Sequence, residues 1–242
     1  MKAFLYPVAI FLFLISCAKK DNGIAQPVLN NGDTTMKSKD TSQITFLALG
    51  DSYTVGSSVS YSESFPVQTF ALLKTQHVDI DTPEIIATNG WTTVNLMNSL
   101  AQNPPQHTPY TLVTLLIGVN NQYQGGSLED YKAGFSQLLI QAISYAGNHK
   151  DHVTVLSIPD YSITPFAAGR DTAEIAKEID AFNSANKQIS LAAGVNYLDI
   201  TGISREAKSD PSLIAADGLH PSGAQYGQWS KLLAALMLQE LR

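Results

Sequence analysis

Three residues of types that perform nucleophilic catalysis stand out in the chain. Ser52 follows the apolar run FLALG almost directly, and Asp217 and His220 lie three residues apart in the segment DGLHPSG. A serine hydroxyl is a weak nucleophile until a neighbouring base takes its proton, and histidine is the usual base. A carboxylate on the other ring nitrogen fixes the tautomer, and one short loop can present both Asp217 and His220. The pattern predicts a catalytic Ser52, Asp217 and His220.

Attack of a serine on a carbonyl carbon creates an oxyanion, which needs hydrogen-bond donors fixed in advance. Three donors are available: the backbone N–H of Ser52, the backbone N–H of Gly90 and the side-chain amide of Asn120. Glycine at position 90 lets the backbone come close to a substrate. We therefore expect Ser52, Gly90 and Asn120 to form an oxyanion hole.

The elements that must position these residues are five short apolar runs. The runs are rich in β-branched residues and mostly continuous, which is typical of strands buried on both faces of a parallel sheet. Ser52, Gly90 and Asn120 lie at or just after the ends of the first three runs, and Asp217 and His220 come after the fifth. The predicted strands cover residues 44–50, 84–90, 111–118, 152–159 and 196–200.

Helical patterns separate the predicted strands. Pro66 is suited to the first turn of a helix, Ser127 and Asp130 resemble a capping box, and Asp171 starts another amphipathic stretch. A last helix is expected after Pro221. Five alternating β and α units predict one doubly wound α/β domain over residues 44–242, in which ligands bind outside the carboxyl ends of the strands.

The N-terminal segment has the composition of a secretory leader. Lys2 precedes a short apolar run that ends at Ser16 and Cys17. The stretch LISC resembles the bacterial lipobox, which implies cleavage before Cys17 and lipidation of its sulfur; a plain leader with an incidental cysteine is the alternative. Residues 18–43 are polar and poor in aromatics, which predicts a flexible tether. We expect a lipid-anchored, extracytoplasmic domain of the bacterial cell envelope, either periplasmic or on the cell surface.

Composition and missing motifs narrow the function further. The net charge of −6, with no basic cluster beyond Lys19 and Lys20, argues against a nucleic-acid partner. The single cysteine excludes an intrachain disulfide. The serine segment reads GDSYT, so it departs from the G-x-S-x-G elbow, and no P-loop, dinucleotide fingerprint or H-E-x-x-H motif is present. No metal and no cofactor is therefore expected.

Four segments of the chain resemble, in order, the conserved blocks of the SGNH/GDSL hydrolases: GDS at 50–52, Gly90, GVN at 118–120 and DGLHP at 217–221. The resemblance implies a flavodoxin-like three-layer α/β/α fold and metal-free hydrolysis of acyl esters of lipids, glycans or small molecules. It implies that Ser52, Gly90, Asn120 and His220 are the residues that name the family. Two departures stand out: the first block continues with Tyr53 rather than Leu, and Asn121 replaces a frequent Asp.

The sequence leaves several alternatives open. The first is hydrolysis through an acyl-enzyme on Ser52, the second is acyl transfer to an alcohol, and the third is a non-catalytic carbohydrate- or lipid-binding module. Trp91, Tyr123 and Phe166 follow strands and either line a pocket or pack in the core. Asp160 either faces the site or closes a turn. Because a single chain carries every candidate residue, a monomer is expected.

Overall fold

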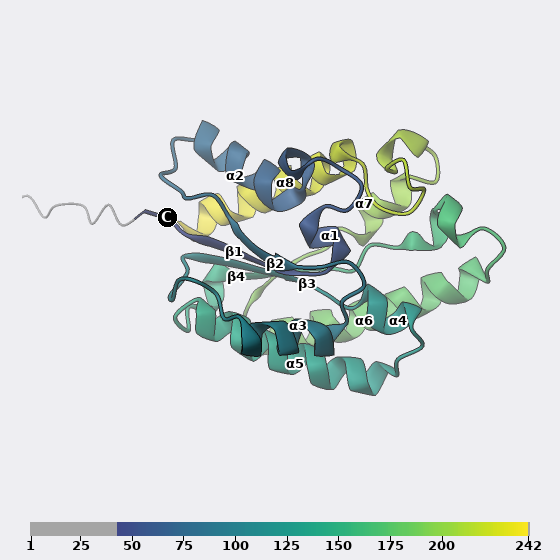
Figure 1. Cartoon of the computed structure of the whole chain (residues 1–242), viewed down its shortest axis with the longest axis horizontal. Helices are drawn as coiled ribbons and strands as arrows, with labels where there is room; N and C mark the ends of the chain where they lie inside the picture. Colours follow the sequence, from purple (N-terminus) through teal and green to yellow (C-terminus); the bar gives the residue numbers. More distant parts are fainter. Residues whose placement is uncertain (1–42, 242) are drawn as a thin grey trace, which may run out of the picture. The chain divides into compact units, whose positions relative to one another are not determined.

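The computed structural model describes residues 43–241. The predicted leader, Cys17 and all of the predicted tether except Gln43 lie outside the described residues, so lipidation and location stay predictions. The described part forms an α/β domain around five parallel strands in the order β2-β1-β3-β4-β5 (Figure 1). The strands are β1 (Phe46–Gly50), β2 (Glu84–Ala87), β3 (Leu112–Leu116), β4 (Val153–Leu156) and β5 (Asn196–Leu198).

The five predicted strands are all present, and they are shorter than the apolar runs that predicted them. The three inner strands β1, β3 and β4 are completely buried, as continuous apolar runs indicate. The outer strands β2 and β5 are only half-buried because each has a neighbour on one side. The predicted burial is thus complete for the inner strands, and the outer pair is less buried because one edge of each has no neighbouring strand.

Helices cover both faces of the sheet, which gives the predicted three layers. The helix pair α2 and α8 packs over one face, and α3, α5 and α6 cover the other (Figure 1). The strand order is that of the flavodoxin-like doubly wound folds. The helices are α1 (Ser52–Val55), α2 (Phe65–Thr75), α3 (Thr93–Gln102), α4 (Val119–Tyr123), α5 (Leu128–Tyr145), α6 (Thr172–Ala193), α7 (Thr201–Glu206) and α8 (Gly223–Glu240).

The long helices begin where the capping residues predict. The Ser127 side chain accepts the Asp130 N–H at 3.0 Å at the start of α5, and Asp171 accepts the Glu174 N–H at 3.0 Å at the start of α6. Such bonds satisfy backbone donors that have no partner inside the helix. The short helices α1, α4 and α7 were not predicted, because four to six residues carry too little periodicity to detect.

The turn from β1 into α1 determines where the nucleophile candidate lies. A Cβ atom on Gly50 would lie 2.1 Å from Thr54 Oγ1 and 2.4 Å from the Leu116 carbonyl oxygen. Glycine is therefore required for α1 to pack against the ends of β1 and β3. Since the chain leaves β1 in one direction to reach β2 and returns to the other side for β3, Ser52 lies at the topological switch point, where such folds bind ligands.

Within residues 43–241, no helix combines the length and the apolar character needed to cross a membrane.

Candidate active site

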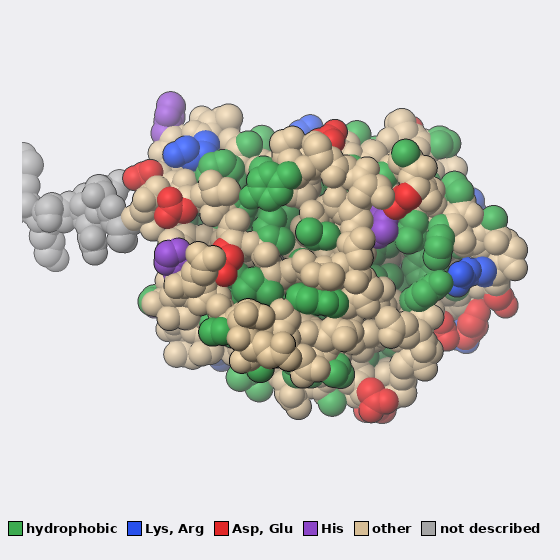
Figure 2. All heavy atoms as spheres, in the orientation of Figure 1, with side chains coloured by type: hydrophobic (Ala, Val, Ile, Leu, Met, Phe, Trp, Pro, Cys, Tyr) green, Lys and Arg blue, Asp and Glu red, His purple; other side chains and the backbone are tan. Residues whose placement is uncertain are grey.

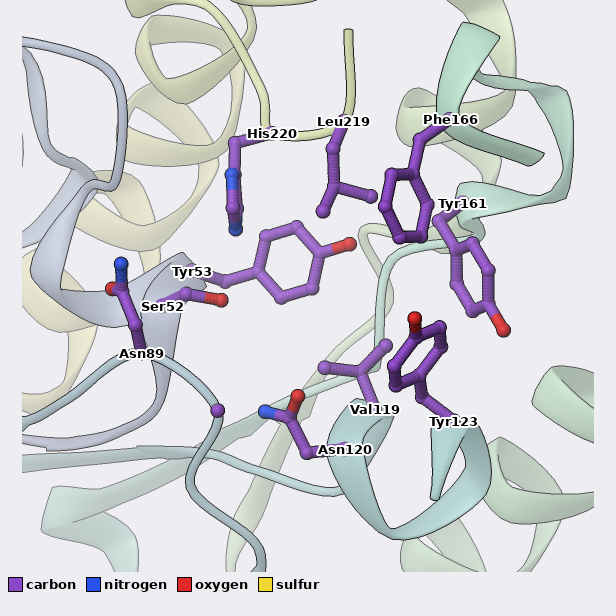
Figure 3. Close-up of a pocket in the computed structure, with 11 residues that line it drawn as sticks. Ser52, Tyr53, Asn89, Val119, Asn120, Tyr123, Tyr161, Phe166, Leu219 and His220 are labelled. Carbon is purple, nitrogen blue, oxygen red and sulfur yellow. The ribbon is translucent and has the colours of Figure 1, made fainter. Parts of the chain in front are cut away.

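A pocket at the carboxyl edge of the sheet contains four of the five predicted site residues. Ser52, Gly90, Asn120 and His220 all line a cavity of about 160 Å³. In Figure 3 the side chains of Ser52, Asn120 and His220 point into the same space from three different elements. The structure thus brings these four residues together in one pocket.

Asp217 lies behind His220, away from the cavity. Its Oδ2 is 2.5 Å from His220 Nδ1, and its Oδ1 accepts the backbone N–H groups of Leu219 and His220, both at 3.0 Å. Partial burial raises the pKa of Asp217, but hydrogen bonds from His220, Ser58 and the backbone outweigh it and hold this pKa below its usual range. A carboxylate that stays ionised fixes the ring of His220 and leaves Nε2 for the pocket.

Ser52 is the first residue of α1, and its side chain opens onto the cavity although the residue is only 6 % exposed. The hydrogen bonds among the described residues do not include one from Ser52 Oγ to His220. Hydrogen bonds between catalytic groups are often long without substrate and shorten in the substrate complex. The structure therefore brings the nucleophile candidate and the base candidate to one pocket.

The three predicted oxyanion donors surround the same space. Within residues 43–241, no hydrogen bond uses the N–H of Ser52, which lies in the first turn of α1, or the N–H of Gly90. Gly90 has a φ of 78°, a left-handed conformation that favours glycine. Asn120 Nδ2 donates to the Trp91 carbonyl at 3.0 Å, which orients the amide and leaves its second hydrogen free.

Asn121, the departure from the family pattern, makes a supporting contact of its own. Its Oδ1 accepts the Thr93 N–H at 3.0 Å, and its Nδ2 donates to Thr93 Oγ1 at 2.9 Å. These bonds tie α4, which carries Asn120, to the first turn of α3. The amide of Asn121 thus connects α4 to α3, because it accepts one hydrogen bond from Thr93 and donates another to it.

The wall of the cavity opposite Ser52 is apolar and mostly aromatic. The rings of Tyr123, Tyr161 and Phe166 pack against one another with centroids 5.9–6.3 Å apart. Figure 2 shows hydrophobic side chains gathered around a hollow on this face, and Figure 3 shows these rings together with Leu219 on one side of the cavity. Tyr123 and Phe166 are therefore pocket residues.

The other candidates from the sequence lie elsewhere. Trp91 does not line this cavity and packs half-buried against the core, although its carbonyl holds Asn120. Asp160 is buried and turned away: it caps the 3₁₀ helix Tyr161–Ile163 and pairs with Arg205 Nε at 2.8 Å. Among residues 43–241, no cluster of three or more His, Cys, Asp or Glu side chains is arranged to hold a metal ion.

Sequence reasoning missed three polar residues at the rim of the site. Asn89 lines the cavity beside Gly90, Ser58 Oγ donates to Asp217 Oδ2 at 2.6 Å, and Ser57 Oγ donates to Asn89 Oδ1. Single serines in a loop have no spacing that marks them. The one signal available was the position of the two serines in the chain, five and six residues after Ser52.

Asp51 is a buried carboxyl directly beside the nucleophile candidate. It is the N-cap of α1, where its Oδ1 accepts the Tyr53 N–H at 3.0 Å. Burial raises the pKa of Asp51 from the usual 3.8 to about 7, against the opposing effect of backbone hydrogen bonds from Tyr53 and Gly118. The carboxyl group of Asp51 therefore holds its proton more tightly in the folded protein than in the unfolded chain.

We expect Asp51→Asn to remove a pH-dependent loss of stability. Between about pH 4 and pH 7 the unfolded Asp51 ionises while the folded one stays protonated, so the wild type loses stability as pH rises through this window. Asparagine keeps a cap acceptor and carries no charge. The variant should gain on the order of a few kcal/mol relative to wild type between pH 4 and pH 8 in urea unfolding. If the difference in unfolding free energy between the two proteins stayed the same from about pH 4 to pH 8, Asp51 could not be a buried group with a raised pKa.

Comparison with known proteins identifies the family. Residues 48–228 match the model of the GDSL-like Lipase/Acylhydrolase family, and this range covers well over half of the chain. The protein belongs to this family. The resemblance of the four sequence blocks to the SGNH/GDSL hydrolases is thereby confirmed. No curated protein sequence is similar enough to count as a match.

Solved structures show the same fold at low sequence identity. A GDSL-like lipase described as putative, from Parabacteroides merdae, is 16% identical with a TM-score of 0.64, and the match covers 80% of this chain and 96% of that one. The esterase EstA from Pseudoalteromonas sp., in a structure inhibited by monoethylphosphonate, is 16% identical with a TM-score of 0.59, and the match covers 81% of this chain and 98% of EstA. The acetylxylan esterase Axe2 from Geobacillus stearothermophilus is 18% identical with a TM-score of 0.56 over 81% and 93%.

Proposed function

We propose that this GDSL-family protein is a serine carboxylic-ester hydrolase with Ser52 as nucleophile. One observation carries the proposal: His220, held by Asp217, shares a single pocket with Ser52 and with the donors of Gly90 and Asn120. Family membership supports ester hydrolysis in general, and the pocket supplies the residues that this chemistry needs.

The first half of the reaction transfers the acyl group to the enzyme. Ser52 Oγ attacks the carbonyl carbon while His220 Nε2 takes the hydroxyl proton, and Asp217 stabilises the imidazolium that forms. The negative charge on the carbonyl oxygen meets the amides of Gly90 and Ser52 and the side chain of Asn120. The alcohol then leaves with the proton from His220, and an ester on Ser52 remains.

The second half repeats the same steps with water. His220 removes a proton from a water molecule, which attacks the acyl carbon of the ester on Ser52. The same donors stabilise the second oxyanion. Collapse of this intermediate breaks the bond to Ser52 Oγ, which regains a proton from His220, and the carboxylic acid is released.

The size and lining of the cavity favour short acyl groups. Its volume of about 160 Å³ is smaller than the roughly 300–1,000 Å³ of pockets that enclose drug-sized ligands. Phe166, Tyr123 and Leu219 form the apolar wall on the side away from the oxyanion donors. The relatives include an acetylxylan esterase, whose acetyl group is the smallest common acyl group, and this agrees with a short-chain preference.

The chain-length profile of p-nitrophenyl ester hydrolysis tests this preference. We expect kcat/KM of the wild type to be highest for acetyl to butyl esters and to fall for longer chains. Phe166→Ala removes part of the wall and should move the optimum toward longer chains, by about tenfold in relative kcat/KM for two to four added methylenes.

Tyr61→Ala provides the matched control, because Tyr61 is an exposed aromatic residue that does not line the cavity. Its profile should follow the wild type. A wild-type optimum at long acyl chains, or a Phe166→Ala profile that coincides with that of Tyr61→Ala, would refute the assignment of the wall to the acyl group.

A further inference from the structure

The dipeptide Ser57-Ser58 follows Gly56, the C-cap of the helix that carries the nucleophile. The N–H groups of Gly56 and Ser57 both donate to the Ser52 carbonyl oxygen, at 3.1 and 3.0 Å. The two serines are thus connected to the backbone of the nucleophile itself. A shift of this dipeptide would be transmitted to Ser52 through the bond from Ser57 N–H.

The side chains of the same two serines reach the other parts of the site. Ser58 Oγ donates at 2.6 Å to Asp217 Oδ2, the oxygen that also contacts His220 Nδ1. Ser57 Oγ donates to Asn89 Oδ1, and Asn89 directly precedes the oxyanion residue Gly90. Segments 32 and 159 residues away along the chain are therefore joined to α1 by two neighbouring hydroxyl groups.

The backbone of Ser58 has an unusual conformation that serves this contact. Its φ is 65°, in the left-handed region that residues other than glycine, asparagine and aspartate seldom adopt. The following residues are fixed, because Ser60 and Glu63 form a reciprocal capping box at the start of the 3₁₀ helix Tyr61–Glu63. A non-glycine residue held in this region next to a catalytic carboxylate indicates a functional constraint.

We propose that Ser57 and Ser58 are positioning residues that fix the acid and the oxyanion turn relative to the nucleophile. Ser58 orients the Asp217 carboxylate against His220, and Ser57 holds the Asn89-Gly90 turn beside Ser52. The proposal rests on the proposed function, because it assigns roles around the same reaction. Neither serine lines the cavity.

The Ser58 bond also determines how much negative charge Asp217 directs at His220. The Ser58 hydroxyl donates a hydrogen bond to Asp217 Oδ2 and thereby stabilises part of the negative charge on that oxygen. When this hydroxyl is removed, more of the charge on Oδ2 interacts with the imidazolium of His220. We therefore expect the acid limb of the pH–rate profile to move when the Ser58 hydroxyl is removed. Other titratable groups near His220 are Tyr53, whose ring centroid lies 5.6 Å away, and Tyr123 and Tyr161 in the same cavity. Asp160 lines a neighbouring small pocket with Tyr53 and His220, and Asp51 lies close enough to Tyr53 to affect its pKa. Ser58 variants leave all of these unchanged.

The test compares the pH profile of kcat/KM for p-nitrophenyl acetate between wild type, Ser58→Ala, Ser58→Gly, Ser57→Ala and the control Ser62→Ala. Ser62 lies in the same segment, and its hydroxyl contacts only that of Ser60. Ser58→Ala should lower kcat/KM about tenfold, mainly through kcat, and move the acid limb upward by about half a pH unit. Ser58→Gly should show the same loss and the same shift as Ser58→Ala. Glycine adopts the left-handed conformation of position 58 without strain, but it supplies no hydroxyl for Asp217.

Ser57→Ala should lower kcat about three- to tenfold through the loss of one hydrogen bond, without moving the acid limb, because Asn89 and Gly90 do not titrate. Ser62→Ala should match the wild type. Wild-type activity in Ser58→Ala, or a rate loss without a shift of the acid limb, would overturn the role of Ser58. Ser58→Gly at full activity would show that only the backbone matters. A folded Ser52→Ala protein that kept more than about a hundredth of the wild-type rate would instead refute the proposed function.

Discussion

Ser52→Ala is expected to lower the kcat for p-nitrophenyl acetate by about 10⁴- to 10⁶-fold, the loss seen when the nucleophile of a serine hydrolase is removed. Alanine cannot form the acyl-enzyme, so only the oxyanion donors would still act on direct attack by water. Because the residue is nearly buried and its Oγ has no hydrogen-bond partner among the described residues, the fold should tolerate the change.

Ser52→Ala should therefore keep the unfolding midpoint of the wild type. Ser57→Ala, which removes a hydroxyl from the same turn, serves as the matched comparison and should lose no more than about tenfold. A folded Ser52→Ala protein that retained more than about a hundredth of the wild-type rate would show that a different group attacks the ester.

Asn120→Ala is expected to lower kcat by about 100- to 1,000-fold with little change in KM. The amide acts on the charge that develops in the transition state, so its loss affects turnover rather than ground-state binding. The measurement is the separation of kcat from KM with p-nitrophenyl acetate as substrate. Asn120 also donates to the Trp91 carbonyl, so the unfolding midpoint must be measured beside the rate.

Asn120→Asp separates the donor from the shape of the side chain. Aspartate is nearly the same size as asparagine but supplies an acceptor and a negative charge where a donor is needed. This variant should be at least as slow as Asn120→Ala. Activity close to wild type in either variant would remove Asn120 from the oxyanion hole and leave that role to Ser52 and Gly90.

The sequence predicted the parts of the fold whose residues repeat at a regular spacing. The inner strands were evident because β1, β3 and β4 are buried on both faces and leave continuous apolar runs. The helices α5 and α6 were evident from Ser127 and Asp171 at their starts. Helix α1, with four residues, has no such signal, although it carries Ser52.

The core of the candidate site was predictable for a different reason. Ser52, Gly90 and Asn120 follow the carboxyl ends of β1, β2 and β3, which must meet at one edge of the sheet. His220 lies in a loop well beyond β5, and the resemblance of the DGLHP block to the family placed it with them. Tyr161 and Leu219 in the wall and Asn89 at the rim required coordinates. Their positions depend on the paths of loops and on the 3₁₀ turns Tyr161–Ile163 and Pro165–Ala167, which no spacing encodes.

The claim that Ser52 is the nucleophile is tested most directly by a fluorophosphonate probe followed by peptide mapping of the adduct. Ser52 Oγ would displace fluoride from phosphorus and pass its proton to His220, as in the attack on an ester. A relative of the same fold, the esterase EstA, is inhibited by monoethylphosphonate. We expect one adduct per chain, located on Ser52, absent from Ser52→Ala and formed far more slowly by His220→Ala. An adduct on another residue, or none in a folded wild type that hydrolyses esters, would contradict it.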